Sequence, residues 1–332
     1  MTVAAELGSA LREFLAAHAK PVEGADPLWP RLRDELGLDG LLVPEAHGGL
    51  GLGTAELIAV ASELGRAVVG GPFIPSAVTA ATVLSTLDLP PATATTLAHV
   101  PFRPSTVDGD DRITGVVGPI LAADGPLLVP VGDRLLLVTD GFTLSRLPSL
   151  DLSRPAFRVE FQATPAVVLA EGPQVAAAVR RAEVATWIAL GAECVGVAGH
   201  ALELTVEHAK TRHQFGRPIG AFQAMQHKLA DLAVTLEVAR SAAEFAVRGA
   251  GADAGGGAGG GAGLERAAHA LAVKASEAAV TITTEAIQLH GGIGFTWEYP
   301  AHVLLRRAHA AAVLAGTPDQ HRRALFALVD EE

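Results

Sequence analysis

The feature that most constrains the fold is a change in the spacing of apolar residues about 100 residues into the chain. Residues 1–95 and 176–332 carry apolar side chains at helical spacing, mostly Ala, Leu and Val. Between these regions, short β-type apolar runs are separated by Gly, Asp and Pro. The sequence therefore predicts an α-rich multi-domain protein in which a small antiparallel β domain is inserted between helical regions.

We expect three consecutive domains: an N-terminal helical domain (1–95), a reduced central β domain (96–175) and a C-terminal four-helix bundle (176–332). Pro72 and Pro75 are expected to break the chain before the last N-terminal helix. The expected N-terminal helices are Ala4–His18, Leu28–Leu36, Ala55–Leu64 and Ser76–Leu87. The expected strands lie within residues 111–117, 126–131, 133–140 and 156–169.

A glycine-rich segment interrupts the C-terminal helical region at residues 249–263, where nine of 15 residues are glycine. Glycine loses much backbone entropy on folding, so such a run favours a flexible connection. The segment follows a helix and lacks the Lys-Ser/Thr of a phosphate-binding loop. We expect a flexible linker between two helices of the bundle.

Charge and cysteine content exclude several classes of function. The formal net charge is −11, whereas nucleic-acid binding requires clustered cations. A single cysteine, Cys194, precludes an intrachain disulfide and is typical of a reducing compartment. The sequence predicts a cytoplasmic protein with no nucleic-acid partner, and it indicates no metal site.

The apolar segments do not predict a targeting signal or a membrane span. The first 20 residues include Glu6 and Arg12, which indicates an amphipathic helix instead of a signal peptide. The most apolar long window, Val184–Val206, contains Glu193, His200 and Glu203. A span needs about 20 nearly uncharged residues, so we expect a buried core helix and no membrane association.

The first motif with chemical content is residues 209–232, AKTRHQFGRPIGAFQAMQHKLADL. Arg212 offers bidentate donors suited to a diphosphate. Phe215 and Gly216 are expected to end a helix with a flat ring and a permissive turn that lets a planar ligand approach. Taken alone, Arg212 paired with an acidic neighbour and Phe215 in the core would explain the motif as well.

The second motif is residues 285–300, EAIQLHGGIGFTWEYP. The run His290-Gly291-Gly292-Ile293-Gly294 is expected to break a helix, and Gln288 stands just before that turn. An ordinary helix C-cap is the alternative interpretation. The two motifs occurring together favour a ligand site.

These two motifs and residues 304–323 closely resemble the acyl-CoA dehydrogenase family, and residues 36–66 resemble the helical opening of that family. The resemblance implies FAD-dependent α,β-dehydrogenation of an acyl-CoA thioester. In the family, these motifs bind the FAD of the neighbouring subunit. Thr317 is the exception, since it is implied to lie near the flavin on the chain's own side.

The resemblance assigns the remaining cofactor-binding positions one by one. Arg212 would meet the pyrophosphate and Phe215 the adenosine side of FAD. Gln223 would hydrogen-bond the ribityl or phosphate region. The motif residues that would line the ADP portion or complete the site are Gln214, Gln288, Gly291, Gly292 and Gly294.

The sequence departs from the family at the catalytic base, which must be a carboxylate close to the α-carbon. The two positions at which the family places this glutamate are Ala315 and Thr186 here, and the residue usually found as arginine is Trp187. Glu193 is a candidate for a relocated base, and so is Asp319. An ordinary solvated or paired carboxylate explains each of them more simply.

Other residues are also open to both interpretations. His290 and His321 stand near the motifs, and either a structural or a chemical role is possible. Ile113-Thr114-Gly115 fits the family's flavin-stacking strand, but residues 119–123 lack its aromatic and threonine residues, and the loop at residues 102–108 differs from the family's Thr-Glu-Pro-type loop. The short β domain therefore predicts an incomplete flavin-ring pocket in this chain.

This pattern resembles the shortened, non-catalytic member of the heteromeric acyl-CoA dehydrogenases of actinobacteria. It implies a heterotetramer with a longer catalytic subunit that shares one FAD per heterodimer, with electron-transfer flavoprotein as acceptor. A homodimer or homotetramer that uses Glu193 remains open. A flavin-free structural or CoA-binding relative is the third hypothesis.

Overall fold

A computed structural model of the chain describes residues 2–19, 28–90, 96–97, 106–108, 111–121, 125–253 and 260–330. Its contacts form two compact units. The first comprises Met1–Pro21, Thr54–Val69 and Trp187–Glu332, and the second comprises Val22–Gly53 and Gly70–Thr186. This grouping follows contacts and cuts across the three domains expected from chain order.

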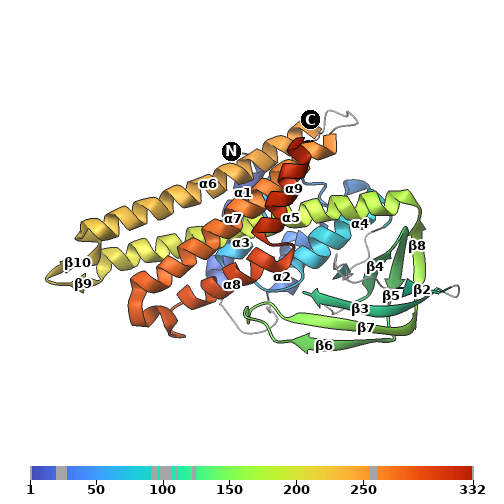
Figure 1. The fold of residues 1–332 in the computed structure, drawn as a ribbon, viewed down its shortest axis with the longest axis horizontal. Coiled ribbons are helices and arrows are strands. Elements are labelled where there is room, and N and C mark those ends of the chain that lie inside the picture. The colour runs from blue at the N-terminus through green and yellow to red at the C-terminus, as the bar shows by residue number, and fades with distance from the viewer. Residues whose placement is uncertain are drawn as a thin grey trace. The chain divides into compact units, whose positions relative to one another are not determined.

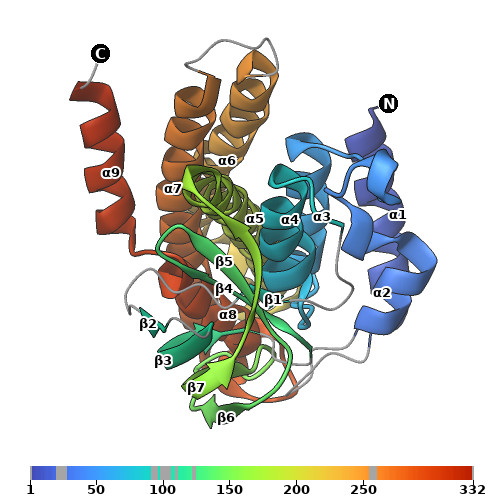
Figure 2. The same ribbon diagram turned by 90° about the vertical axis from the view of Figure 1, so that its right-hand side faces the viewer.

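The predicted order of helices, strands and helices is confirmed, and with it the α-rich fold class (Figures 1 and 2). The N-terminal elements are α1 (Val3–His18), α2 (Trp29–Leu36), η1 (Leu38–Gly40), η2 (Glu45–His47), α3 (Thr54–Arg66), the π-helix η3 (Phe73–Ala80) and α4 (Ala81–Thr86). The strands that follow are β1 (Thr96–Leu97), β2 (Thr106–Val107), β3 (Arg112–Ile120), β4 (Leu127–Val131), β5 (Arg134–Val138), β6 (Phe142–Leu147), β7 (Ala156–Pro165) and β8 (Val167–Glu171).

The C-terminal elements are α5 (Pro173–Thr211), β9 (His213–Gln214), β10 (Arg217–Pro218), η4 (Ile219–Ala221), α6 (Gln223–Asp253), α7 (Gly260–His290), η5 (Gly291–Phe295), α8 (Ala301–Leu314) and α9 (Pro318–Asp330). The predicted linker at 249–263 was wrong for residues 249–253 and 260–263, which are helical. A side chain at Gly249 would meet Leu264 Cα at 3.3 Å, so close packing of α6 on α7 overrides the low helix propensity of glycine. Residues 254–259 lie outside the described part of the chain.

Two further expectations require correction. Pro75 does not break the chain, because it is the third residue of the helical segment that begins at Phe73, where a backbone N–H has no partner within the helix. Strand β6 was not predicted. Its residues Thr143, Leu144, Ser145 and Arg146 are all exposed, so the burial signal that marks a strand is absent there.

The second unit is built on two four-stranded sheets, with strand orders β1-β4-β5-β8 and β2-β3-β7-β6 (Figures 1 and 2). All pairings are antiparallel except that of β1 with β4. Apolar side chains between the sheets form one core, among them Ile113, Leu127, Val159 and Phe161. A second core joins β4 and β5 to α4 and the first part of α5.

The first unit is the helical bundle, in which α7 packs against α6, α8 and α9 (Figure 2). Helix α5 passes close to its neighbours through small residues. A Cβ at Gly191 would lie 2.6 Å from Leu271 of α7, and one at Gly196 would clash with the Ser62 carbonyl of α3. Helix α5 is long and apolar enough to cross a membrane, but 83% of its apolar window is buried inside the protein, as expected for a core helix.

The contact between α3 and α5 predicts a strong position effect for alanine. Gly196→Ala should lower the free energy of unfolding by about 1–3 kcal/mol, because the added methyl group has no room beside Ser62. Gly199→Ala is the matched control one turn along α5, since its Cβ would meet Arg240 Nη2 at an ordinary 3.6 Å. It should be neutral or stabilising by up to about 1 kcal/mol. Urea unfolding measures both; equal effects would contradict the interpretation.

Candidate cofactor-binding site

Helix α5 ends at Thr211, earlier than expected, and a two-stranded hairpin follows. Arg217 pairs with Gln214 and Pro218 with His213, which leaves Phe215 and Gly216 as the two turn residues. Both have positive φ values, +52° and +78°, as a type I′ hairpin turn requires. The expectation that Phe215 and Gly216 end the helix itself was therefore wrong.

Phe215 is an unusual residue for this turn, because left-handed backbone favours Gly, Asn or Asp. Phe215 is 91% exposed, and its ring meets that of Phe222 edge-on at a centroid distance of 6.2 Å. The alternative that Phe215 is a core residue is thus wrong. A strained backbone that holds an aromatic ring in solvent is typical of a binding position.

The glycine turn follows α7, which ends at His290 as expected. His290 Nδ1 donates to the Ala286 carbonyl (2.6 Å), and its Nε2 lies 2.9 Å from the Tyr299 hydroxyl, which also reaches the Leu204 carbonyl. Burial lowers the pKa of His290. His290 therefore has a structural role: it ties both sides of the glycine turn together.

The two sequence motifs meet through His208, a residue that the sequence interpretation overlooked. Its ring stacks on His290 at 4.4 Å between centroids, and Arg212, four residues after His208, directly follows the last residue of α5. Burial lowers the pKa of His208, and the neighbouring His290 and Arg212 lower it further. Only its spacing of four residues from Arg212 could have suggested this role.

Arg212, Gln214, Gln223 and Gln288 all have exposed side chains at this end of the bundle, where Figure 1 shows the β9–β10 hairpin. Within the described part of the chain, no acidic side chain pairs with the Arg212 guanidinium. This cation and these amides are suited to a phosphate-containing ligand, since they can donate several hydrogen bonds at once.

The three glycines of the turn differ in what this chain requires of them. Gly291 has φ +63°, and a Cβ at Gly294 would lie 3.1 Å from the Ile287 carbonyl oxygen, so the fold itself explains both. Gly292 has neither constraint, because nothing lies within 4 Å of a Cβ there. Its lack of a side chain leaves the backbone open to a ligand or to another subunit, as an ADP-lining position would require.

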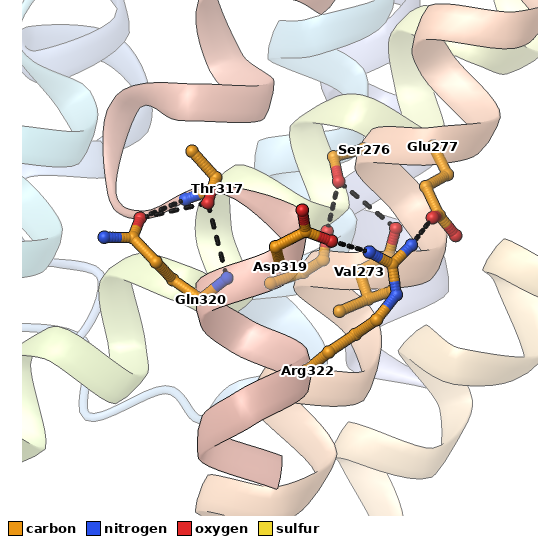
Figure 3. A network of polar contacts seen from close by, with 8 residues as sticks. Val273, Ser276, Glu277, Thr317, Asp319, Gln320 and Arg322 are labelled. Atoms are coloured by element: carbon orange, nitrogen blue, oxygen red, sulfur yellow. Dashed lines mark hydrogen bonds and ion pairs between the residues drawn. The ribbon is translucent and has the colours of Figure 1, made fainter. Parts of the chain in front are cut away.

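Thr317 lies apart from this group, at the start of α9. Its hydroxyl accepts from the Gln320 backbone N–H (3.3 Å), and the Gln320 side chain accepts from the Thr317 N–H (2.7 Å), which is a capping box (Figure 3). Nearby, Arg322 bridges Asp319 of α9 and Glu277 of α7. Asp319 is thus an exposed, ion-paired carboxylate, as the simpler interpretation expected.

Thr186 and Ala315, at the two expected base positions, take part in structural hydrogen bonds. The Thr186 hydroxyl donates to the Ala182 carbonyl and lies 2.7 Å from the Thr79 hydroxyl. The Trp187 indole N–H donates to the Ala315 carbonyl at 3.1 Å. Trp187, Ala315, His321 and eight further residues line a cavity of about 20 Å³, enough for about one water molecule.

Glu193 is 3% exposed and forms an ion pair with Arg307, which is fully buried. Its Oε2 lies 3.5 Å from Arg307 Nη1, which also donates to the Val69 carbonyl (3.0 Å). Glu193 does not line the small cavity beside Ala315. Glu193 thus has a structural partner in Arg307, and its role as a base stays a prediction.

His321, another residue with two possible roles, contacts a second histidine: its Nδ1 lies 2.8 Å from His269 Nδ1.

The described residues contain no cluster of three or more His, Cys, Asp or Glu that could hold a metal ion. The groups that lie at the end of the bundle are a guanidinium, several side-chain amides, accessible backbone at Gly292 and an exposed aromatic ring. Those groups can bind a nucleotide-containing ligand at a surface that another chain can reach.

Comparison with known proteins agrees with this geometry. The family described as "Acyl-CoA dehydrogenase, N-terminal domain" matches residues 3–87, and "Acyl-CoA dehydrogenase, C-terminal domain" matches residues 178–327. The chain is 33% identical to acyl-CoA dehydrogenase IpdE2 of Mycolicibacterium smegmatis, over 96% of this chain and 97% of the relative.

Two solved structures are similar over almost the whole chain. The Tcur3481-Tcur3483 steroid ACAD G363A variant has a TM-score of 0.84 and 29% identity, with 99% of this chain and 98% of that chain covered. The ChsE4-ChsE5 complex from Mycobacterium tuberculosis has a TM-score of 0.85 and 25% identity, with 100% and 98% covered. The chain belongs to the acyl-CoA dehydrogenase family, whose members are FAD-dependent oxidoreductases that act on acyl-CoA in lipid and steroid degradation.

The buried ion pair predicts that Glu193→Gln acts on stability. Removing the carboxylate charge leaves the buried Arg307 charge uncompensated, which should cost about 3–5 kcal/mol in the free energy of unfolding. Glu207→Gln is the control, because that exposed pair with Lys210 contributes about 0–1 kcal/mol. Urea unfolding distinguishes them. Loss of turnover with unchanged stability would instead favour Glu193 as a base.

His290 predicts a pH dependence of stability. Its pKa in the folded chain is below the ordinary 6.5, so the unfolded chain binds more protons as the pH falls below that value. The stabilisation is complete above pH 6.5 and decreases as the pH falls. His290→Gln should reduce the loss of stability between about pH 7.5 and about pH 5.5 in urea titrations. Tyr299→Phe keeps the imidazole and should retain the dependence; identical slopes in all three proteins would refute the prediction.

Proposed function

We propose that this chain is a subunit of an FAD-dependent acyl-CoA dehydrogenase and completes the FAD site of a partner subunit. The supporting observation is the exposed set Arg212, Gln214, Gln223 and Gln288 beside an open glycine turn. These groups fit a dinucleotide: a guanidinium for the pyrophosphate, amides for the sugar and phosphate oxygens, and backbone that a ligand can approach. Bound FAD would supply the hydride acceptor of the dehydrogenation.

The hairpin supports a partner as well as a cofactor. Phe215 exposes 91% of its surface, and Phe295 and Trp297 of the glycine-turn region expose 70% and 69%. Exposed aromatic side chains in one region mark interaction surfaces, because they bury large areas on binding. In the proposed assembly, Phe215 contacts the adenosine side of the cofactor held by the partner, and the other two rings pack near it.

The proposed role also follows from what stands at the base positions. Neither Thr186 nor Ala315 can accept the α-proton, and the neutral indole of Trp187 cannot replace a carboxylate. We therefore place the base on a longer partner subunit. The names of the similar structures, a Tcur3481-Tcur3483 steroid ACAD and a ChsE4-ChsE5 complex, support a two-component assembly and a bulky acyl-CoA substrate of steroid type. Electron-transfer flavoprotein is the proposed acceptor, and the cytoplasm the proposed compartment.

A self-sufficient dehydrogenase that uses Glu193 is the second candidate, and it requires Arg307 to release the carboxylate during turnover. The third is a flavin-free relative that uses the glycine turn only for subunit contact. The four exposed donors Arg212, Gln214, Gln223 and Gln288 argue against the third candidate, because subunit packing alone does not require such a set at one end of the bundle.

Arg212→Gln should test the half-site in a complex co-purified with a longer family member that has a glutamate at a base position. Loss of charge-assisted hydrogen bonds should weaken FAD binding about 10- to 100-fold, measured by fluorescence titration of the apo-complex. Arg248→Gln is the matched control, since this exposed arginine lies on α6 and forms an ion pair with Glu244, away from the Arg212 motif. It should bind FAD like the wild type.

The chain expressed alone should carry little flavin and show no acyl-CoA oxidation. A yellow, homogeneous preparation that reduces an artificial acceptor with acyl-CoA would refute the proposed role. Absence of flavin both alone and in every co-purified complex would support the flavin-free relative.

A further inference from the structure

The two halves of the proposed binding set lie on separate elements of the first unit. Arg212 directly follows α5, whereas Gln288 belongs to α7 and Gly292 to the turn after it. One ligand can bond both halves only if their spacing is right. A spacing that is fixed before binding also avoids the free-energy cost of ordering the two halves around the ligand. A contact between the end of α5 and the end of α7 would supply it.

The rings of His208, His290 and Tyr299 form such a contact. His208 of α5 stacks on His290, the last residue of α7, with ring centroids 4.4 Å apart and planes inclined by 32°. Tyr299 lies against His290 at 4.6 Å and meets His208 edge-on at 6.5 Å. The three rings thus join α5, α7 and the segment that follows the glycine turn.

Hydrogen bonds fix the members of this group that α5 does not supply. His290 Nδ1 donates to the Ala286 carbonyl (2.6 Å), and its Nε2 lies 2.9 Å from the Tyr299 hydroxyl. The Tyr299 hydroxyl also lies 3.5 Å from the Leu204 carbonyl of α5, a distance at which a hydrogen bond is weak. The ring of His208 is therefore the principal contact of α5 with this group.

The main chain connects the stacked rings to both halves of the binding set. The Arg212 N–H donates to the His208 carbonyl at 2.9 Å. On the other side of the stack, Gln288 precedes His290 by two residues, and Gly292 follows it by two. A shift of His208 against His290 would therefore change the spacing of Arg212 from Gln288 and Gly292.

A neutral ring suits the position of His208. Burial lowers the pKa of His208, and the neighbouring His290 and Arg212 lower it further, so the imidazole is uncharged at neutral pH. A carboxylate four residues before Arg212 would instead pair with the guanidinium and occupy its donors. The imidazole holds α5 against α7 and leaves the Arg212 side chain available to a ligand.

We propose that His208 is a positioning residue, whose stacking on His290 holds Arg212 at the spacing from Gln288 and Gly292 that lets one FAD bond both halves of the set. This inference rests on the proposed function, in which those residues bind the FAD of the partner. His208 itself need not touch the ligand. Its effect on affinity is exerted through Arg212 and should largely disappear when the guanidinium is absent.

His208→Ala tests this in the co-purified complex, by fluorescence titration of the apo-complex with FAD. The dissociation constant should rise about three- to tenfold, but by less than about twofold when Arg212→Gln is already present. His208→Phe keeps a stacking ring and should bind FAD within about twofold of the wild type. His18→Ala is the matched control and should change nothing, since it removes an exposed histidine that lies against Phe14 on α1 (4.6 Å).

The outcomes separate this inference from the proposed function. Wild-type affinity in Arg212→Gln would refute the half-site and the inference together. Weak binding by Arg212→Gln with unchanged binding by His208→Ala would overturn the inference alone. Equal losses from His208→Ala in both backgrounds, or a His208→Phe complex as weak as His208→Ala, would do the same. If His208→Ala does not fold, His208→Leu keeps apolar volume without the ring; it should show the same loss, and wild-type binding by it would equally overturn the inference.

Discussion

The first unit depends on how closely α3 approaches α5. At Gly65 and Gly196 the two helices pass with backbone against backbone, and a single methyl group at either position would clash with the other helix. This contact fixes α5, which then carries groups at widely separated points. The part of α5 that belongs to this unit begins at Trp187, and Arg212 follows the C-terminal end of the helix, 25 residues later. An α-helix rises about 1.5 Å per residue along its axis, so the two residues are held far apart. One rigid helix thus relates the α8–α9 turn to the hairpin.

The polar side chains on α5 and directly after it are of two kinds: some bond to other residues of the chain, and others are exposed. Trp187 and Glu193 are buried and bonded to Ala315 and Arg307. Arg212 is exposed and makes no ion pair within the described part of the chain. Trp187 and Glu193 thus act within the chain, whereas Arg212 is available to a ligand or a partner at the surface. This division, more than any single substitution, favours the proposed role in a partner's FAD site.

The sequence was enough to predict the N-terminal helices, the helical C-terminal region and the end of α7 at the glycine turn, because each depends on local backbone preference. The expected strand runs overlapped β3, β4, β5, β7 and β8. Strands β1, β2 and β6, the hairpin at Phe215 and the helical ends at 249–253 and 260–263 were not predicted, because they depend on tertiary contacts. The motif residues could be identified from the sequence, but their grouping could not. The stack of His208 on His290 joins segments about 80 residues apart, and no local pattern encodes it.

Phe215 sits in a left-handed turn with its ring almost wholly in water. The free-energy cost of this backbone conformation is part of folding, so a ligand or subunit that covers the ring need not order the loop on binding. The same exposure has a cost during synthesis. A newly made chain that displays this ring together with Phe295 and Trp297 can associate with other copies or with unrelated proteins before its proper contact forms. Balanced production with a covering subunit would then limit aggregation as well as build the assembly.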